Sequence, residues 1–71
     1  MGGIESTYSY KSKLDVFEKM IKQLDYYNIP VYYSELYKEY FVIEKPNVRR
    51  YILCQKYVNC YGISYYECYL E

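Results

Sequence analysis

Two prolines, Pro30 and Pro46, limit where helices can run in this chain of 71 residues. Proline biases the residue before it away from helical backbone angles and lacks the N–H that a helix interior requires. Pro30 therefore ends any helix that precedes it. Pro46 breaks the chain again, and it suits the first turn of whatever helix follows. The sequence is thus predicted to form short elements on either side of these two residues.

The segment SKLDVFEKMIKQLDYYN, residues 12–28, is predicted to form the clearest helix. Ser12 suits the N-cap position, and Asp15 near the first turn complements the positive end of the helix dipole. Apolar residues recur at steps of three and four, which predicts one buried stripe. The stripe consists of Leu14, Phe17, Met20, Ile21 and Leu24.

The remaining segments predict two more helices and a β element. IPVYY, residues 29–33, favours a brief strand or an extended connection, and SELYKEYF, residues 34–41, favours a second helix capped by Ser34. Residues 47–58 are predicted to form a third helix. ISYYECYL, residues 63–70, alternates as a strand does. YVNC, residues 57–60, fits either the end of the third helix or a strand that pairs across a turn at Gly62.

Domain organisation follows from length and composition. The chain is long enough for one domain, and its 14 tyrosines indicate a folded core rather than a disordered tail. Residues 1–11 are expected to be a flexible arm, and residues 12–71 the domain. The first six residues match the short M-G-x-x-x-S pattern of N-myristoylation, which also arises by chance. The sequence has no long apolar run and no secretory signal, so we expect a cytoplasmic protein that does not contact membranes.

Several classes of function are disfavoured by missing residue types. Histidine is absent, which removes the commonest general base and the commonest metal ligand. The sequence also lacks a glycine-rich phosphate loop and a Cys-x-x-Cys pair. We therefore expect no enzyme activity, no cofactor, no metal and no small-molecule substrate. Cys54, Cys60 and Cys68 fit either free thiols or one intrachain disulfide with a spare thiol.

Positive charge is concentrated in residues 45–66, although the net charge of the chain is zero. Residues 45–66 contain four basic residues and no acidic one. On a helical wheel, residues 47–58 place Val48, Tyr51, Ile52, Cys54, Gln55 and Val58 on one half and Arg49, Arg50, Leu53, Lys56 and Tyr57 on the other. Arginine matches phosphates and guanine edges because its planar fork donates two parallel hydrogen bonds. The second half is either a DNA-reading surface or a solvated basic face.

In their order and signals, residues 29–70 resemble a winged helix-turn-helix domain, and the likeness extends over residues 13–70. The stretches that carry it are SEL at 34–36, the turn VIEKPN, the start NVRRYI, and Gly62 followed by Ile63. The chain is similar to small tyrosine-rich, histidine-free regulators from viruses and plasmids of hyperthermophilic archaea. The resemblance implies an α+β fold with three helices and a C-terminal strand or hairpin as the wing.

The resemblance also implies a site and a partner. The groove-facing and phosphate-facing positions would be Ser34, Lys45, Asn47, Arg49, Arg50, Leu53, Lys56 and Tyr57, with Tyr65 and Tyr66 on the wing. The implied function is sequence-specific binding of double-stranded DNA in transcription regulation, possible as a homodimer and in the cytoplasm of an infected host cell. The alternative is a protein–protein interaction module. Neutral charge and abundant tyrosine favour it, and YYECYL could offer an exposed strand edge.

Overall fold

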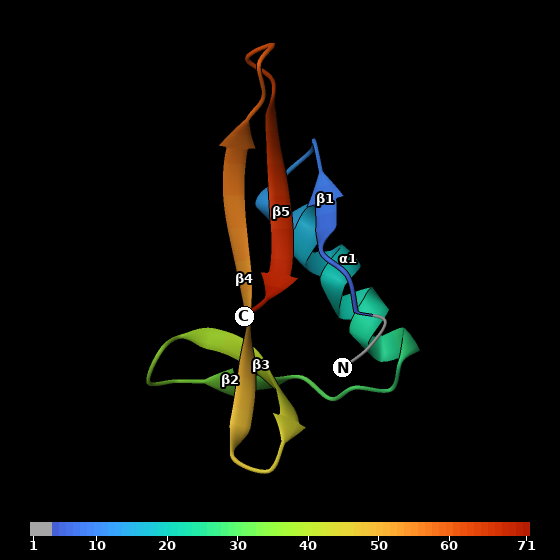
Figure 1. The fold of residues 1–71 in the computed structure, drawn as a ribbon, viewed down its shortest axis with the longest axis vertical. Coiled ribbons are helices and arrows are strands. Elements are labelled where there is room, and N and C mark those ends of the chain that lie inside the picture. The colour runs from blue at the N-terminus through green and yellow to red at the C-terminus, as the bar shows by residue number, and fades with distance from the viewer. Residues whose placement is uncertain (1–3) are drawn as a thin grey trace.

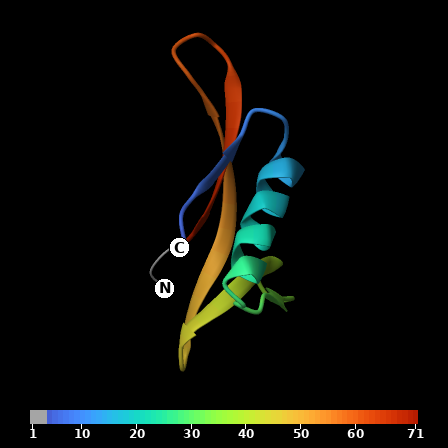
Figure 2. The same cartoon turned by 90° about the vertical axis from the view of Figure 1, so that its right-hand side faces the viewer.

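The computed structural model describes residues 4–71 and consists of one helix and five strands. The elements are β1 (Thr7–Ser9), α1 (Lys13–Tyr26), β2 (Tyr32–Ser34), β3 (Glu39–Lys45), β4 (Val48–Val58) and β5 (Ser64–Leu70). The strands form one antiparallel sheet in the order β1-β5-β4-β3-β2 (Figure 1). The helix lies against one face of this sheet and leaves the other uncovered (Figure 2).

The first helix is confirmed, including its cap. The Ser12 side chain accepts a hydrogen bond from the Asp15 backbone N–H at 3.0 Å. At the other end Asn28 has a φ of 58°, and the N–H of Ile29 donates to the carbonyl of Leu24 at 2.9 Å. This is the Schellman arrangement, which satisfies the last carbonyls of a helix. The predicted stripe needs one correction, because Leu14 is 65 % exposed while Val16 is fully buried.

The predicted three-helix winged helix is wrong, because both later helices are replaced by strands. Residues 35–38 form a turn, and Lys38 takes a positive φ of 55°, which ends β2 and starts β3. Ser34 caps this turn and not a helix, since its hydroxyl accepts from the Tyr37 N–H at 3.3 Å. Of the brief strand or extended connection predicted for residues 29–33, the structure has a strand, β2, that begins at Tyr32.

Residues 47–58 are strand and turn because Pro46 and Asn47 form a hairpin connection. Proline at the first central position and a positive φ at the second, here 68° at Asn47, is the pattern of a type II turn. Pro46 therefore starts no helix. The following VRRYILCQKYV is rich in β-branched and aromatic residues, which fit a pleated surface with two packed faces.

β4 joins two halves of the sheet. Its first residues pair with β3, from Lys45↔Val48 to Phe41↔Tyr51, while Ile52↔Leu70 to Val58↔Ser64 pair it with β5 on its other side. β5 confirms the strand predicted for residues 63–70 and continues to β1 through Thr7↔Cys68. The arm expected to be flexible thus contributes an edge strand. Of the myristoylation pattern, Met1–Gly3 lie outside the described residues.

The core lies between α1 and the covered face of the sheet, which is the face that α1 packs on. Its buried members are Val16, Met20, Leu24, Val42, Ile52 and Cys68. Polar contacts tie β1 to the helix at the border of this core. The Ser9 hydroxyl donates to the Asp15 carboxylate, and the Thr7 hydroxyl donates to the Val16 carbonyl at 3.1 Å. The Ser9 hydrogen bond, together with nearby lysines, holds the pKa of Asp15 below its usual range.

Candidate functional site

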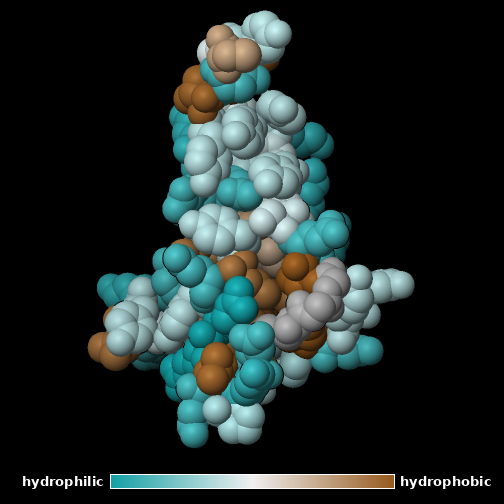
Figure 3. Space-filling model, in the orientation of Figure 1, coloured by the Kyte–Doolittle hydropathy of each residue, from teal (hydrophilic) through white to brown (hydrophobic). Residues whose placement is uncertain are grey.

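The face of the sheet that α1 leaves uncovered, called here the open face, is lined with aromatic side chains. Successive side chains of a strand point to opposite faces of the sheet. The residues next to a core residue along its own strand therefore point to the open face. In Figure 3 pale side chains, in the hydropathy range of tyrosine, spread over this face along β4 and β5. The aromatic residues of the open face are Tyr8, Tyr10, Tyr32, Tyr37, Phe41, Tyr51, Tyr57, Tyr65 and Tyr69.

Around β5 the rings of the open face contact one another in a continuous row. Tyr65 stacks on Tyr57 with ring centroids 5.4 Å apart, and it also contacts Tyr10 at 5.9 Å and Tyr8 at 6.3 Å. Gln55 links the row to Tyr69, because it donates to the Tyr69 hydroxyl at 2.7 Å and accepts from Tyr57 at 2.9 Å. These contacts hold the rings in fixed positions relative to one another.

A second cluster of rings lies around β3. The Phe41 ring is buried although it is on the open face, because Tyr32 and Tyr51 flank it at 5.7 and 5.6 Å. The Arg49 guanidinium covers it, with Cζ 4.4 Å from the ring centroid, which is a cation–π contact. Tyr37 meets the edge of Tyr51 at 5.8 Å. Both halves of the open face are therefore preorganised aromatic surfaces.

Carboxylates predominate among the charged groups of the open face. Glu67 lies beside Tyr8 and Tyr57, and Glu39 and Glu71 border a hollow with Tyr51. A hydrogen bond to Glu67 raises the pKa of Tyr8, while partial burial, followed by Glu67, raises the pKa of Tyr57. Partial burial also raises the pKa of Tyr69. These phenols stay neutral at physiological pH and keep their hydroxyl donors.

The residues predicted to contact DNA are not brought together. Arg49, Leu53 and Tyr57 are on the open face, whereas Arg50 and Lys56 point to the opposite face. Residues that lie on one side of a helix can lie on opposite faces of a strand, because the side chains of a strand alternate. Ser34, Lys45 and Asn47 lie in β2, at the end of β3 and in the following turn.

Arg50 is engaged within the fold. Its guanidinium binds Glu44 at 3.2 Å and donates to the Leu70 carbonyl at 3.2 Å. The hydrogen bond from Arg50 lowers the pKa of Glu44, which keeps this carboxylate ionised. Arg50 therefore joins β3 to β5 instead of facing an external ligand.

The thiols form a pair and a separate residue. Cys54 and Cys68 face each other across β4 and β5, with their sulfur atoms 2.9 Å apart, while Cys60 is exposed in the connecting turn. All three are free cysteines. Burial and the contact with Cys54 raise the pKa of the Cys68 thiol. Residues 4–71 contain no group of three or more His, Cys, Asp or Glu side chains placed to hold a metal ion.

Sequence reasoning missed the open face because residues 34–41 and 47–58 were predicted as helices. One signal was available: the row Ile63, Tyr65, Glu67 and Tyr69 in the predicted C-terminal strand. Tyr65 and Tyr69 of that row are on the open face, whereas Tyr66 packs against the core. The same alternation in residues 48–58 would have separated Tyr51 and Tyr57 from Ile52 and Cys54.

The comparisons with known proteins give no family for this chain. No family model matches it, and neither the curated proteins nor the solved structures include a significant match. Within the described part of the chain, α1 is too short and too polar to cross a membrane.

Proposed function

We propose that this chain is a protein-interaction module that binds a partner protein with the open face of its sheet. The observation that carries the proposal is the preorganised aromatic surface extending across all five strands. Tyrosine and arginine are enriched at the energetically important centres of protein interfaces, because they offer large contact area and a hydrogen-bonding end. Rings that already contact one another lose little side-chain entropy on binding.

The charges of the open face indicate the chemistry of the partner. Glu39, Glu67 and Glu71 favour a partner surface on which lysine or arginine side chains lie among apolar ones. Cations of that kind also interact favourably with the faces of the tyrosine rings. The same carboxylates repel phosphates, so they oppose nucleic-acid binding at this surface. DNA binding remains a prediction that no observation tests, but it has lost the recognition helix on which it depended.

The test is affinity capture from an extract of the cells that express the protein, followed by titration of the purified partner. The variant is Tyr57→Ser with Tyr65→Ser, which removes one stacked pair of the open face. The control is Tyr26→Ser with Tyr27→Ser, a contacting pair at the end of α1. We expect the open-face variant to bind the partner at least about tenfold more weakly, and the control to bind as the wild type does.

Two results would overturn the proposal. One is a captured protein that binds the open-face variant and the wild type equally. The other is wild-type binding to a generic DNA duplex that weakens steeply with salt, with no protein captured, because that slope is the signature of phosphate contacts.

A further inference from the structure

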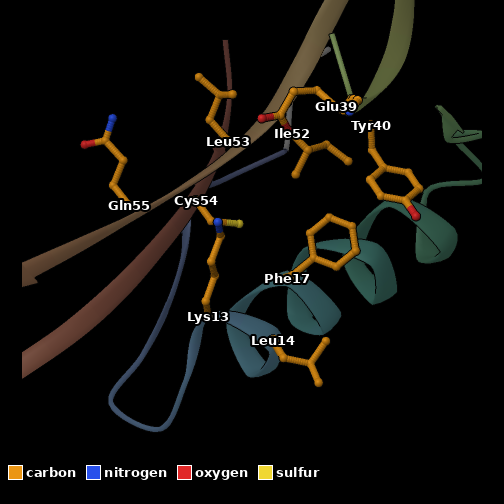
Figure 4. Close-up of a pocket in the computed structure, with 10 residues that line it drawn as sticks. Lys13, Leu14, Phe17, Glu39, Tyr40, Ile52, Leu53, Cys54 and Gln55 are labelled. Atoms are coloured by element: carbon orange, nitrogen blue, oxygen red, sulfur yellow. The ribbon is translucent and has the colours of Figure 1, made fainter. Parts of the chain in front are cut away.

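A groove beside β4 is lined by side chains from both faces of this strand. Such a groove must lie along the edge of the strand, because only there are both faces accessible. Ile52, Leu53, Cys54 and Gln55 are consecutive, so their side chains alternate between faces, yet all four line one hollow of about 630 Å³. In Figure 4 the strand runs between Leu53 and Gln55 on one side and Ile52 and Cys54 on the side of α1. The hollow therefore lies along the side of β4 that points away from β5.

The backbone of β4 along this groove faces no other strand of residues 4–71. Tyr51 exchanges two hydrogen bonds of 2.9 Å with Glu71, so the odd-numbered residues of β4 direct their backbone groups toward β5. The even-numbered residues point the opposite way, where the register with β3 reaches no further than Phe41↔Tyr51. The N–H and C=O groups of Cys54, Lys56 and Val58 consequently form an open edge.

The walls of the groove are apolar and its rim is basic. Leu14 and Phe17 of α1 and Tyr40 of β3 form the wall opposite the strand, and Leu14 is 65 % exposed there. Lys13 and Lys38 also line the groove, against a single carboxylate, that of Glu39. Lys56 adds a third ammonium group along the open edge. In an extended peptide bound here, one row of side chains would contact the apolar wall of the groove. Its other side chains would reach the lysines at the rim of the groove.

We propose that the open edge of β4, residues 54–58, binds an extended acidic peptide segment of a partner protein by strand addition. The peptide would pair with the backbone of Cys54, Lys56 and Val58. One row of its side chains, apolar, would lie over Leu14 and Phe17, and its carboxylates would meet the lysines of the rim. Main-chain hydrogen bonds supply affinity in this mode of recognition, and the pockets for alternate side chains supply specificity.

A second copy of the chain fits this edge less well than an acidic peptide does. If two β4 edges paired antiparallel about a two-fold axis, the central residue Lys56 would lie directly opposite the Lys56 of the other copy. Like charges directly opposite each other destabilise strand pairing. Lysine on an edge strand is also a common protection against edge-to-edge aggregation. The same ammonium group attracts an acidic peptide.

The experiment selects binders from a display library of random peptides about 12 residues long, which spans somewhat more than the five-residue edge. The best peptide is then added to the isotopically labelled protein, and amide hydrogen exchange is followed by NMR. We expect selected peptides that alternate apolar and acidic residues. They should slow exchange of the Cys54 and Lys56 amides about tenfold or more, because these N–H groups gain a hydrogen-bond acceptor.

Two variants and a control distinguish this site from others. Lys56→Glu should weaken peptide binding about tenfold through charge repulsion, and Leu14→Ser should weaken it through loss of the apolar wall. Both side chains are exposed, so the fold should persist, which circular dichroism checks. Lys22→Glu, the same charge change on an exposed helix position outside the groove, should bind as the wild type does.

Each contrary result overturns the proposal. These results are a selection that yields no binder, peptides that protect other amides, and binding that Lys56→Glu leaves unchanged. Light scattering that shows a dimer protecting the same amides would assign the edge to a second copy. An open-face variant away from this edge, Tyr10→Ser with Tyr65→Ser, should still bind the selected peptide, so failure at one surface is distinguishable from failure at the other.

Discussion

The two faces of the sheet use alternate residues of the same strands but place different chemistry on them. The covered face buries aliphatic side chains and a thiol, such as Val42, Ile52 and Cys68, against α1. The open face places tyrosines and carboxylates where water reaches them. Tyrosine suits such a surface because its ring gives contact area and its hydroxyl remains hydrated. The comparison separates residues that stabilise the fold from residues available to a partner.

The largest expected effect is on the free energy of unfolding, when a large side chain is truncated to alanine in the core and on the open face. Leu24→Ala removes a fully buried side chain and should lower the free energy of unfolding by about 2–5 kcal/mol, as cavities in cores do. Tyr10→Ala, on a side chain that is 69 % exposed, should cost less than about 1 kcal/mol. Urea denaturation followed by circular dichroism measures both. Equal losses would show that the open face is part of the core.

That contrast was only partly predictable from the sequence. The helix at residues 13–26 was found because a cap, a 3.6-residue apolar period and a following proline agree. The strand at residues 64–70 was found because its alternation is bounded by Gly62. β4 was missed because apolar or aromatic residues occur on both of its faces, so no polar alternation marks it as a strand. A helical wheel then divided those residues into a mostly apolar half and a basic half, as expected of an amphipathic helix.

The adjacent arginines show the cost of that error. On a helix they lie on one basic surface, whereas on β4 Arg49 covers Phe41 and Arg50 binds Glu44 on the other side of the sheet. The open face depends on cross-strand neighbours such as Phe41↔Tyr51, which are distant in sequence. The turn at Pro46 and Asn47 was the local signal, since proline followed by asparagine suits a hairpin as well as a helix start.

The next effect is on the alkylation rates of an exposed thiol, Cys60, and a thiol buried on the covered face, Cys68. With iodoacetamide at mildly alkaline pH, exposed Cys60 should be alkylated about 100-fold faster than Cys68. Cys68 is buried and its pKa is raised, so its thiolate is strongly disfavoured in the folded protein. Peptide mass spectrometry over time locates the label. If Cys68 reacted as fast as Cys60 in the folded protein, the covered face would not be closed to solvent.

The smallest effect is on the ionisation of the open face. Glu67→Gln should lower the pKa of Tyr8 and of Tyr57 toward the ordinary tyrosine value, because it removes the carboxylate that disfavours both phenolates. In the wild type the raised pKa values contribute stability below the unfolded tyrosine pKa of about 10, and this stability is lost as pH rises through the folded values. Ultraviolet titration of tyrosinate measures the change. Unaltered curves in the variant would show that Glu67 does not contact the rings.

The pairing of β1 with β5 has a consequence for the order in which the molecule folds. Thr7 meets Cys68, so this pair closes a long loop that contains every other element. The hairpins β3–β4 and β4–β5 close loops of only a few residues and therefore lose less chain entropy on forming. We expect the hairpins to form first and β1 to dock last, once α1 supplies the acceptors for Ser9 and Thr7. The amides of β1 should accordingly be the first strand amides to exchange with solvent.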